Sequence, residues 1–145
     1  MTDRRTVWII LLLATALRLV IAARIPLVDD EAYYWTWSQR LAWGYPDHPP
    51  AIAAAIRATT SVLGNSALAV RAGPILLHLG IAWLLYDLGR RMFGAETGAL
   101  AALWYQTVPL FSIGGMLSFP DAPFIFFWML SKRARTSGGI SSGER

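Results

Sequence analysis

The stretch "ALAVRAGPILLHLGIAWLLYDL" at residues 67–88 decides the class of fold, because it is apolar over almost its whole length. Its charged residues are Arg71 near the start and Asp87 near the end. A helix that crosses the hydrocarbon core of a bilayer needs about 20 mainly apolar residues. This stretch therefore predicts a membrane-spanning helix.

The composition of the whole chain agrees with a membrane protein. Of the 145 residues, 55% are hydrophobic and 15% are charged, and there is no cysteine. A typical soluble domain is about 45–50% apolar and about 25% charged. The absence of cysteine excludes a disulfide framework and a thiolate metal site. The net charge of +4 comes from basic residues at the ends of apolar runs, which argues against a nucleic-acid partner, since such a partner needs a basic face.

Three further apolar segments predict spans. Residues 7–23 contain one charge, Arg18, and follow two arginines, so a secretory signal peptide is the rival interpretation of this segment. Residues 97–119 carry no charge and predict one continuous span that tolerates Pro109. A fourth apolar run is cut short by the basic cluster at 132–135. The predicted fold is an all-α multi-pass membrane protein with about four transmembrane helices and interfacial helices in its outer loops.

The loops are predicted to place the acidic residues on one side of the membrane. Residues 51–63 lie between Pro50 and Gly64, which favours a helix that is too short to span. If the N-terminus is cytoplasmic, seven Lys and Arg residues lie inside and four lie outside, as the positive-inside rule favours. The outer side then holds Asp30, Glu31, Asp47, His48 and Asp121.

Residue chemistry leaves two interpretations of "DDEAYYWTWSQRLAWG" (29–44) open. On a helix that ends at Gly44, Asp30 and Glu31 lie in the first turn, where the helix dipole favours anions, and Tyr34 shares their face. The structural interpretation is an acid-capped interfacial helix with an aromatic belt. The functional interpretation is that a carboxylate serves as a general base or a metal ligand.

The same two interpretations apply to the other acidic residues. Asp47 and His48 stand in a stiff, proline-rich turn, where they either cap the turn or present a hydrogen-bonding pair. Asp121 stands at the start of an apolar helix. It either caps this helix or is a functional group at the edge of the membrane. Within the spans, Arg18 is expected to snorkel or to pair with an outer carboxylate, and His78 to hydrogen-bond between helices.

Four blocks of sequence occur in a recognisable order: "DDEAYYWTWSQRLAWGYPDHPPAIAA", "ALAVRAGPILL", "LYDLGRRMFG" and "LSFPDAPFIFFW". Together they resemble the N-terminal part of bacterial integral-membrane glycosyltransferases of the GT-C fold, in the group of protein O-mannosyltransferases and aminoarabinose transferases. The similarity covers residues 7–130. It implies transfer of a sugar from a polyprenyl-phosphate donor to a lipid, glycan or protein acceptor at the outer face of the bacterial cytoplasmic membrane.

The resemblance also implies roles for individual residues. Asp30 and Glu31 match an acidic pair in the first outer loop and Asp121 matches an aspartate in the second, so these three are the catalytic candidates. The substrate-binding candidates are Tyr34, Asp47, His48, Arg57 and Arg71, and the donor phosphate is assigned to either Arg57 or Arg71. A divalent cation is a candidate cofactor, with Asp30, Glu31 and His48 as its candidate ligands.

Members of this group usually have several hundred residues. The resemblance therefore implies that the present chain corresponds to only part of such a protein. Residues 1–130 are expected to form the N-terminal transmembrane part of such a domain. Residues 131–145, which are basic and rich in Gly and Ser, are expected to form a tail that is disordered or foreign to the fold. On this interpretation the chain is a truncated and inactive fragment. The alternative is a small non-catalytic membrane scaffold or assembly protein whose acids only cap helices.

Overall fold

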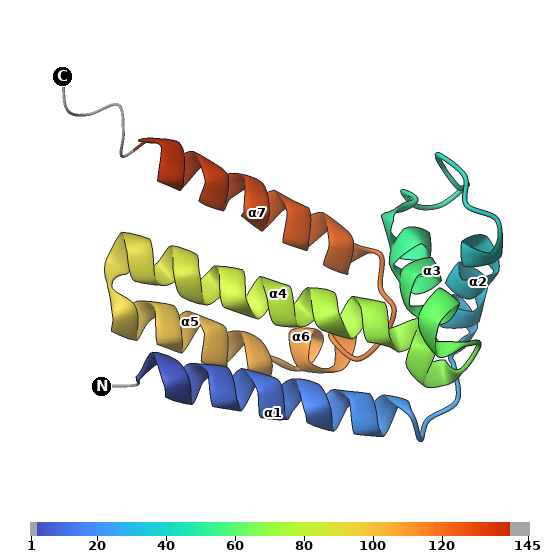
Figure 1. Cartoon of the computed structure of the whole chain (residues 1–145), viewed down its shortest axis with the longest axis horizontal. Coiled ribbons are helices and arrows are strands. Elements are labelled where there is room, and N and C mark those ends of the chain that lie inside the picture. The colour runs from blue at the N-terminus through green and yellow to red at the C-terminus, as the bar shows by residue number, and fades with distance from the viewer. Residues whose placement is uncertain (1–2, 140–145) are drawn as a thin grey trace.

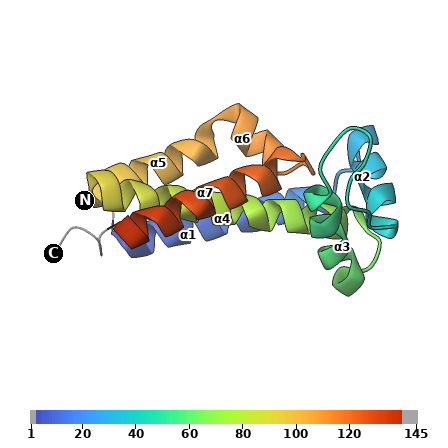
Figure 2. The ribbon, with the colours of Figure 1, turned by 90° about the horizontal axis from the view of Figure 1, so that it is seen from above.

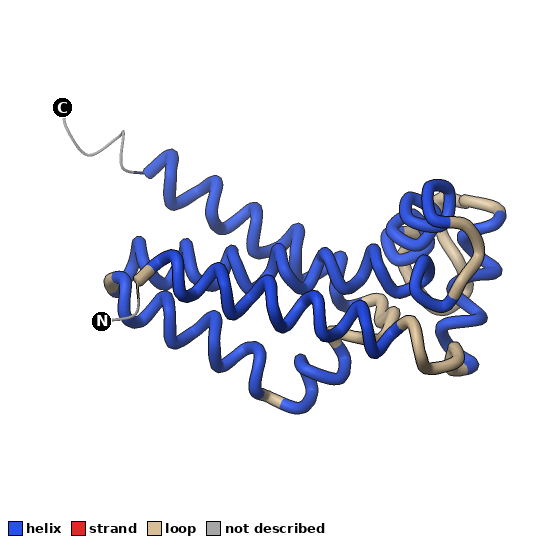
Figure 3. Tube along the Cα trace, turned by 60° about the horizontal axis from the view of Figure 1, so that its bottom comes forward, coloured by secondary structure: helices blue, strands red, loops and turns tan. Residues whose placement is uncertain are grey.

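The chain folds into helices joined by short loops. The structure is a computed structural model that describes residues 3–139, and over this range it contains seven α-helices and no strand (Figure 3). This confirms the predicted all-α class. The helices are α1 (Arg4–Ala22), α2 (Asp29–Gln39), α3 (Ala51–Leu63), α4 (Ala67–Phe93), α5 (Ala95–Thr107), α6 (Pro109–Gly114) and α7 (Asp121–Gly139).

The helices form a bundle with a cap at one end. Helices α1, α4, α5 and α7 run roughly along one axis, and α2 and α3 form the cap at the end opposite both chain termini (Figure 1). The view from above shows the same separation between bundle and cap (Figure 2). Helix α4 is central, because it packs against α1, α3, α5 and α7. The bundle and the cap each have their own cluster of buried apolar side chains, and Val70 at the start of α4 belongs to that of the cap.

Two of the helices are long and apolar enough to cross a membrane, namely α1 and α4. Helix α1 buries one stripe of residues against the bundle, including Val7 and Leu11. Its opposite side carries large apolar side chains that are 57% exposed at Ile9, 64% at Leu13 and 60% at Leu17. An exposed apolar face of this kind is suited to contact with lipid, and both helices agree with a membrane protein.

The span predicted over residues 97–119 is not one continuous helix. Helix α5 ends at Thr107, and a short helix, α6, begins at Pro109. Proline disfavours the helical conformation of the residue before it, and Val108 accordingly has an extended backbone with ψ of 121°. The structure therefore confirms two helices of spanning length and not the predicted four.

The ends of two other helices also differ from the predicted ones, whereas α3 has the predicted bounds. Helix α2 ends at Gln39 and does not continue to Gly44. The loop that follows is closed by the Tyr45 hydroxyl, which accepts a hydrogen bond from the Ala42 amide at 3.1 Å, while the Tyr45 ring stacks on Trp37 at 4.4 Å between centroids. These contacts replace another turn of helix.

Helix α7 continues into the predicted tail. Residues 131–139 are helical, because basic side chains at their start have partners in the bundle. The Arg133 Nε donates to the Asp87 carboxylate at 2.8 Å, and its guanidinium lies 4.6 Å from the centre of the Trp83 ring. The rest of the predicted tail, 140–145, lies outside the described residues.

Helices α4 and α5 form a close antiparallel hairpin through Gly94, whose φ of +97° suits glycine. Their closest approach is at Gly98, where a Cβ atom would lie 2.5 Å from the Tyr86 carbonyl oxygen and 2.6 Å from the Arg90 amide nitrogen. Both neighbours are backbone atoms, so a side chain at residue 98 would force the helices apart. The hairpin therefore depends on glycine at this position.

Substitution of Gly98 tests this packing. We expect Gly98→Ala to lower the free energy of unfolding by about 1–3 kcal/mol, the usual cost of overpacking, as measured by denaturant unfolding in detergent micelles. Gly44→Ala is the matched control, because a Cβ there would meet nothing within 4 Å. An equal effect of the two substitutions would contradict close packing at Gly98.

Candidate functional site

A buried ion pair joins the cap to the bundle. Arg71 is 0% exposed and Glu31 is 1% exposed. The Arg71 Nε donates to the Glu31 carboxylate at 2.8 Å, and Nη2 of the same guanidinium donates to its second oxygen. The remaining Arg71 donors reach the carbonyl oxygens of Ala22, Ile25 and Pro26 at 2.8–3.1 Å. Because a guanidinium has five N–H donors, Arg71 is fully hydrogen-bonded.

The Glu31 carboxylate is equally occupied. Besides Arg71, it accepts hydrogen bonds from the backbone amides of Val28 and Ser118, each at 3.1 Å. Ser118 lies just before α7, so one carboxylate ties together α2, α4 and the segment that leads to Asp121. With these four hydrogen bonds, both oxygens of the carboxylate have partners within the protein.

These contacts correct two of the predicted roles. The Glu31 carboxylate is buried against Arg71 and is not available to accept a proton from a substrate. The Arg71 guanidinium has no donor left for a donor phosphate. Both residues instead fix the positions of their neighbours.

The predicted metal site does not form either. Of the three candidate ligands, Glu31 is directed into the ion pair with Arg71. Within residues 3–139 the structure holds no group of three or more His, Cys, Asp or Glu side chains placed to bind a metal ion. Glu31 is therefore not grouped with Asp30 and His48 as the predicted ligand set requires.

Three exposed carboxylates gather around Tyr34, and we call them the acidic cluster: Asp30, Asp47 and Asp121. Tyr34 is only 6% exposed, and burial raises the pKa of its hydroxyl, with the negative charges of Asp30, Asp47 and Asp121 adding to the effect. Coulomb interactions of this kind act at short range in water. Residues that are far apart in the sequence thus meet at one end of the molecule, as the predicted topology requires.

Aromatic side chains of α2 fix the loop that carries Asp47 and His48. The Tyr33 hydroxyl donates to the Asp47 carboxylate at 3.1 Å, and this hydrogen bond is the main cause that raises the pKa of Tyr33. The His48 ring lies edge-on to Tyr34, with 5.7 Å between ring centres. The turn therefore lies beside the helix that presents Asp30.

Sequence reasoning missed two residues of this site. Tyr33 is one of several aromatic residues in the stretch 29–44, and nothing in the sequence distinguishes it from the others, although a phenol beside a loop aspartate is a natural hydrogen-bond donor. Ser118 contributes a backbone amide, for which the sequence offers no signal. Its hydroxyl also bonds to the Val70 carbonyl oxygen at 3.3 Å, which holds the loop before α7 against α4.

The other predicted polar residues lie away from the acidic cluster. Arg57 is exposed on α3, and its guanidinium takes part in no ion pair within residues 3–139. His78 hydrogen-bonds to the Tyr105 hydroxyl, which confirms the predicted role between helices. Arg18 donates hydrogen bonds to the Gln106 side chain and to the Ser112 carbonyl oxygen. Of the two alternatives expected for Arg18, pairing with an outer carboxylate is therefore not the one seen.

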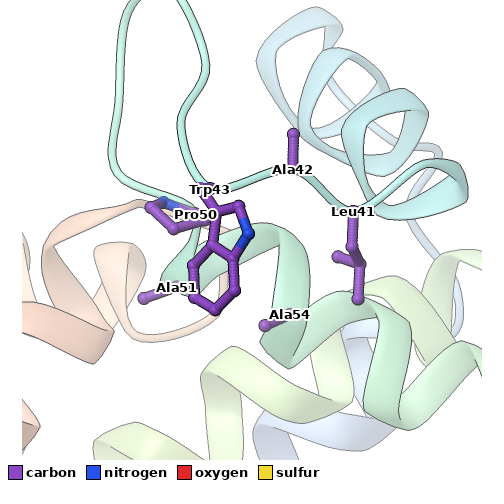
Figure 4. A pocket seen from close by; sticks show the side chains of 6 residues that line it. All are labelled: Leu41, Ala42, Trp43, Pro50, Ala51 and Ala54. Atoms are coloured by element: carbon purple, nitrogen blue, oxygen red, sulfur yellow. The ribbon is translucent and has the colours of Figure 1, made fainter.

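Two apolar pockets lie in the cap and the adjoining part of the bundle, and one of them includes a residue of the acidic cluster. One, with a volume of about 450 Å³, is lined by Leu41, Ala42, Trp43, Pro50, Ala51 and Ala54. In Figure 4 the Trp43 indole extends from the α2–α3 loop toward α3, where Ala51 and Ala54 lie. A second pocket of about 340 Å³ includes Asp121 and His78 among mainly apolar residues of α6, α7 and the loop between them. Carboxylates and apolar hollows thus adjoin each other.

This arrangement has a specific chemical capacity. An exposed carboxylate beside other anions can accept a proton from a hydroxyl group that is brought within hydrogen-bond reach. Apolar pockets next to it can hold a hydrocarbon chain whose polar head reaches the acids. The site therefore suits a reaction between a hydroxyl group and an amphipathic molecule.

Comparisons with known proteins point the same way. A family model described as dolichyl-phosphate-mannose-protein mannosyltransferase matches residues 47–133. Lipid A galacturonosyltransferase RgtD from Rhizobium johnstonii is 35% identical over 99 residues, which are 68% of this chain and 21% of that protein. The chain thus spans about a fifth of the length of the curated relative that it matches. No solved structure matches it.

The ion pair is tested by removing one partner. We expect Arg71→Leu to lower the free energy of unfolding by about 3–5 kcal/mol, because it leaves the Glu31 charge buried and unpaired. The double variant Glu31→Gln/Arg71→Leu should regain part of this loss. Arg57→Leu, an exposed arginine, is the control in the same denaturant titration. Similar losses for the two single variants would contradict the proposed role of the pair.

The raised pKa of Tyr34 predicts a dependence of stability on pH. The folded chain holds this proton to higher pH than the unfolded chain, so its stabilising effect is complete below about pH 10 and is lost as the pH rises through the folded-state pKa. We expect Tyr34→Phe to flatten the alkaline fall in unfolding free energy, and Asp30→Asn to reduce it. Asp29→Asn is the control, since Asp29 is not among the charges that act on Tyr34, and an equal effect of both asparagines would contradict the cluster.

Proposed function

The chain belongs to the dolichyl-phosphate-mannose-protein mannosyltransferase family, and from this premise we propose that its acidic cluster serves glycosyl transfer. The donor is a sugar carried on a polyprenyl phosphate. The acceptor is a hydroxyl group of a lipid, glycan or protein. The observation that carries this proposal is that three acidic segments meet. Glu31, next to Asp30, binds the Ser118 amide close to Asp121, and the Tyr33 hydroxyl of the same helix binds Asp47.

The proposed reaction forms one glycosidic bond and breaks one bond to phosphate. The acceptor oxygen attacks the anomeric carbon of the sugar, and the bond from that carbon to the phosphate oxygen breaks, so the phosphate leaves with the electron pair. The acceptor proton passes to the Asp30 carboxylate, which acts as general base. Asp121 faces the positive charge that develops on the sugar ring in an oxocarbenium-like transition state.

Other residues of the site bind and orient the substrates in this proposal. Asp47 and His48 line the sugar site, held by Tyr33 and Tyr34. Of the two arginines predicted to bind the donor phosphate, Arg57 has an exposed guanidinium, and we assign that role to it. The apolar pockets beside the acids suit the isoprenoid tail of the donor or the hydrocarbon part of a lipid acceptor.

The distribution of charge supports a location in the cytoplasmic membrane with the acidic cluster outside. The bundle end that bears both termini is basic, as the cytoplasmic ends of membrane helices usually are. The basic residues of that end are Arg4, Arg5, Arg90, Arg91, Lys132, Arg133 and Arg135. The cap end instead carries Asp29, Asp30, Glu31, Asp47 and Asp121. The catalytic face is then the extracytoplasmic one.

An exchange between this chain and its relative tests the proposed base. The matching 99 residues of the Rhizobium galacturonosyltransferase are replaced by those of this chain, and the chimera is assayed for modification of lipid A in membranes. We expect Asp30→Asn to lower the rate of the active chimera by about 10²–10⁴-fold, the usual contribution of a general base. Asp29→Asn, the neighbouring exposed carboxylate, should keep the rate within about threefold.

Two results would contradict the proposal. One is a chimera that inserts normally into the membrane and transfers no sugar, as the scaffold alternative predicts. The other is an equal rate for the Asp30→Asn and Asp29→Asn chimeras, which would remove Asp30 from the mechanism.

A further inference from the structure

A second polar region lies at the opposite end of the molecule, beside a groove between α4 and α7. Helix α7 diverges from α4 toward the end that bears the chain termini (Figure 1), and the same divergence is visible in Figure 3. Here a pocket of about 420 Å³ opens between the two helices. We call it the basic groove, and its lining residues are Leu88, Met92, Trp128, Lys132, Arg135 and Thr136.

The basic groove combines an apolar floor with a cationic rim. Leu88 and Met92 lie one turn apart on α4, and Trp128, Lys132 and Arg135 recur along one face of α7 at spacings of four and three. Met92 is 59% exposed and Trp128 is 54% exposed, so apolar surface remains open beside the charges. Such a surface is complementary to an amphipathic anion.

Within residues 3–139, no carboxylate neutralises the two cations on the rim. The nearby carboxylate is that of Asp87, and it is already engaged by Arg90, Arg91 and Arg133. Within residues 3–139, neither Lys132 nor Arg135 takes part in an ion pair. The Lys132 Nζ lies 5.1 Å from the centre of the Trp128 ring, which directs the ammonium toward the apolar floor. Two unpaired cations thus face the same groove.

The hydroxyl group of Thr136, which lines the groove, already donates its proton within the helix. The Thr136 Oγ1 bonds to the carbonyl oxygens of Lys132 and Arg133 at 3.3 and 2.8 Å. It therefore has no proton to offer a ligand, and recognition falls to the two cations. A ligand with a compact negative charge, such as a phosphodiester, fits them better than a neutral polar group does.

We propose that the basic groove binds one anionic phospholipid of the inner leaflet. Its headgroup phosphate lies between Lys132 and Arg135, and one acyl chain lies along Leu88, Met92 and Trp128. Basic pockets between membrane helices on the cytoplasmic side are suited to such headgroups. The bound lipid fills the wedge between α4 and α7 and holds α7 in place. This inference depends on the membrane setting and not on sugar transfer.

Lipid titration of the purified chain in nonionic detergent, followed by native mass spectrometry, tests the proposal. The probes are phosphatidylglycerol and phosphatidylcholine with identical acyl chains. We expect the chain to bind phosphatidylglycerol at least about tenfold more tightly. Lys132→Gln/Arg135→Gln should weaken this binding by about 30-fold, since each basic residue contributes about 1 kcal/mol to attraction by anionic lipid.

Matched variants separate the groove from general electrostatic attraction. Arg4→Gln/Arg5→Gln removes the same charge from the same end of the molecule but outside the groove, and it should change the affinity by less than about twofold. Met92→Ser should weaken the binding of both lipids and keep the preference for phosphatidylglycerol.

Three results would overturn the proposal. Equal losses of affinity for phosphatidylglycerol in the two double variants would mean that the basic end attracts the lipid through its overall positive charge and not through the basic groove. Equal affinity of the unaltered chain for the two lipids would remove the recognition of the headgroup. Displacement of phosphatidylglycerol by an equal concentration of soluble glycerol phosphate would mean that the site binds free phosphate and that the acyl chain adds nothing.

Discussion

The ion pair between Arg71 and Glu31 is the constraint on which the arrangement of the site depends. An unpaired charge in a helical core costs several kcal/mol, so each of these residues requires the other to be buried. Their hydrogen bonds reach the loop after α1, the first turn of α2 and the amide of Ser118. The elements that carry Asp30 and Asp121 are thereby fixed relative to α4.

Helix α4 connects the ion pair to the other helices of the molecule. Helix α4 contacts the cap at its first turns and the rest of the bundle along its length. A displacement of α4 at the ion pair would therefore also shift its contacts with α1, α3, α5 and α7. The close contact at Gly98 gives α5 a unique position on α4. The molecule thus carries the acidic cluster at the cap end and the basic groove at the other, a difference that suits a protein with different surroundings at its two ends.

The catalytic proposal and the proposed lipid site use these two ends in different ways. At the cap, exposed acids lie beside apolar pockets, which suits a donor with a hydrocarbon tail and a reacting head. In the basic groove, two cations lie beside apolar surface, which suits a phospholipid that does not react. The difference follows from charge, because an anion can accept a proton at neutral pH whereas arginine and lysine act there by binding.

The sequence by itself determined the helical class, the bounds of α3, the apolar segments of α1 and α4 and the gathering of Asp30, Asp47 and Asp121 at one end. These features follow from hydropathy, from the Pro50 and Gly64 signals and from topology, which are local or nearly local properties. Only the tertiary structure decided that Glu31 is a buried partner of Arg71 while its neighbour Asp30 faces the site. Adjacent acids in the first turn of a helix look alike in sequence. The contacts of Glu31 with Arg71 of α4 and with the Ser118 amide before α7 bury it, whereas Asp30 stays exposed.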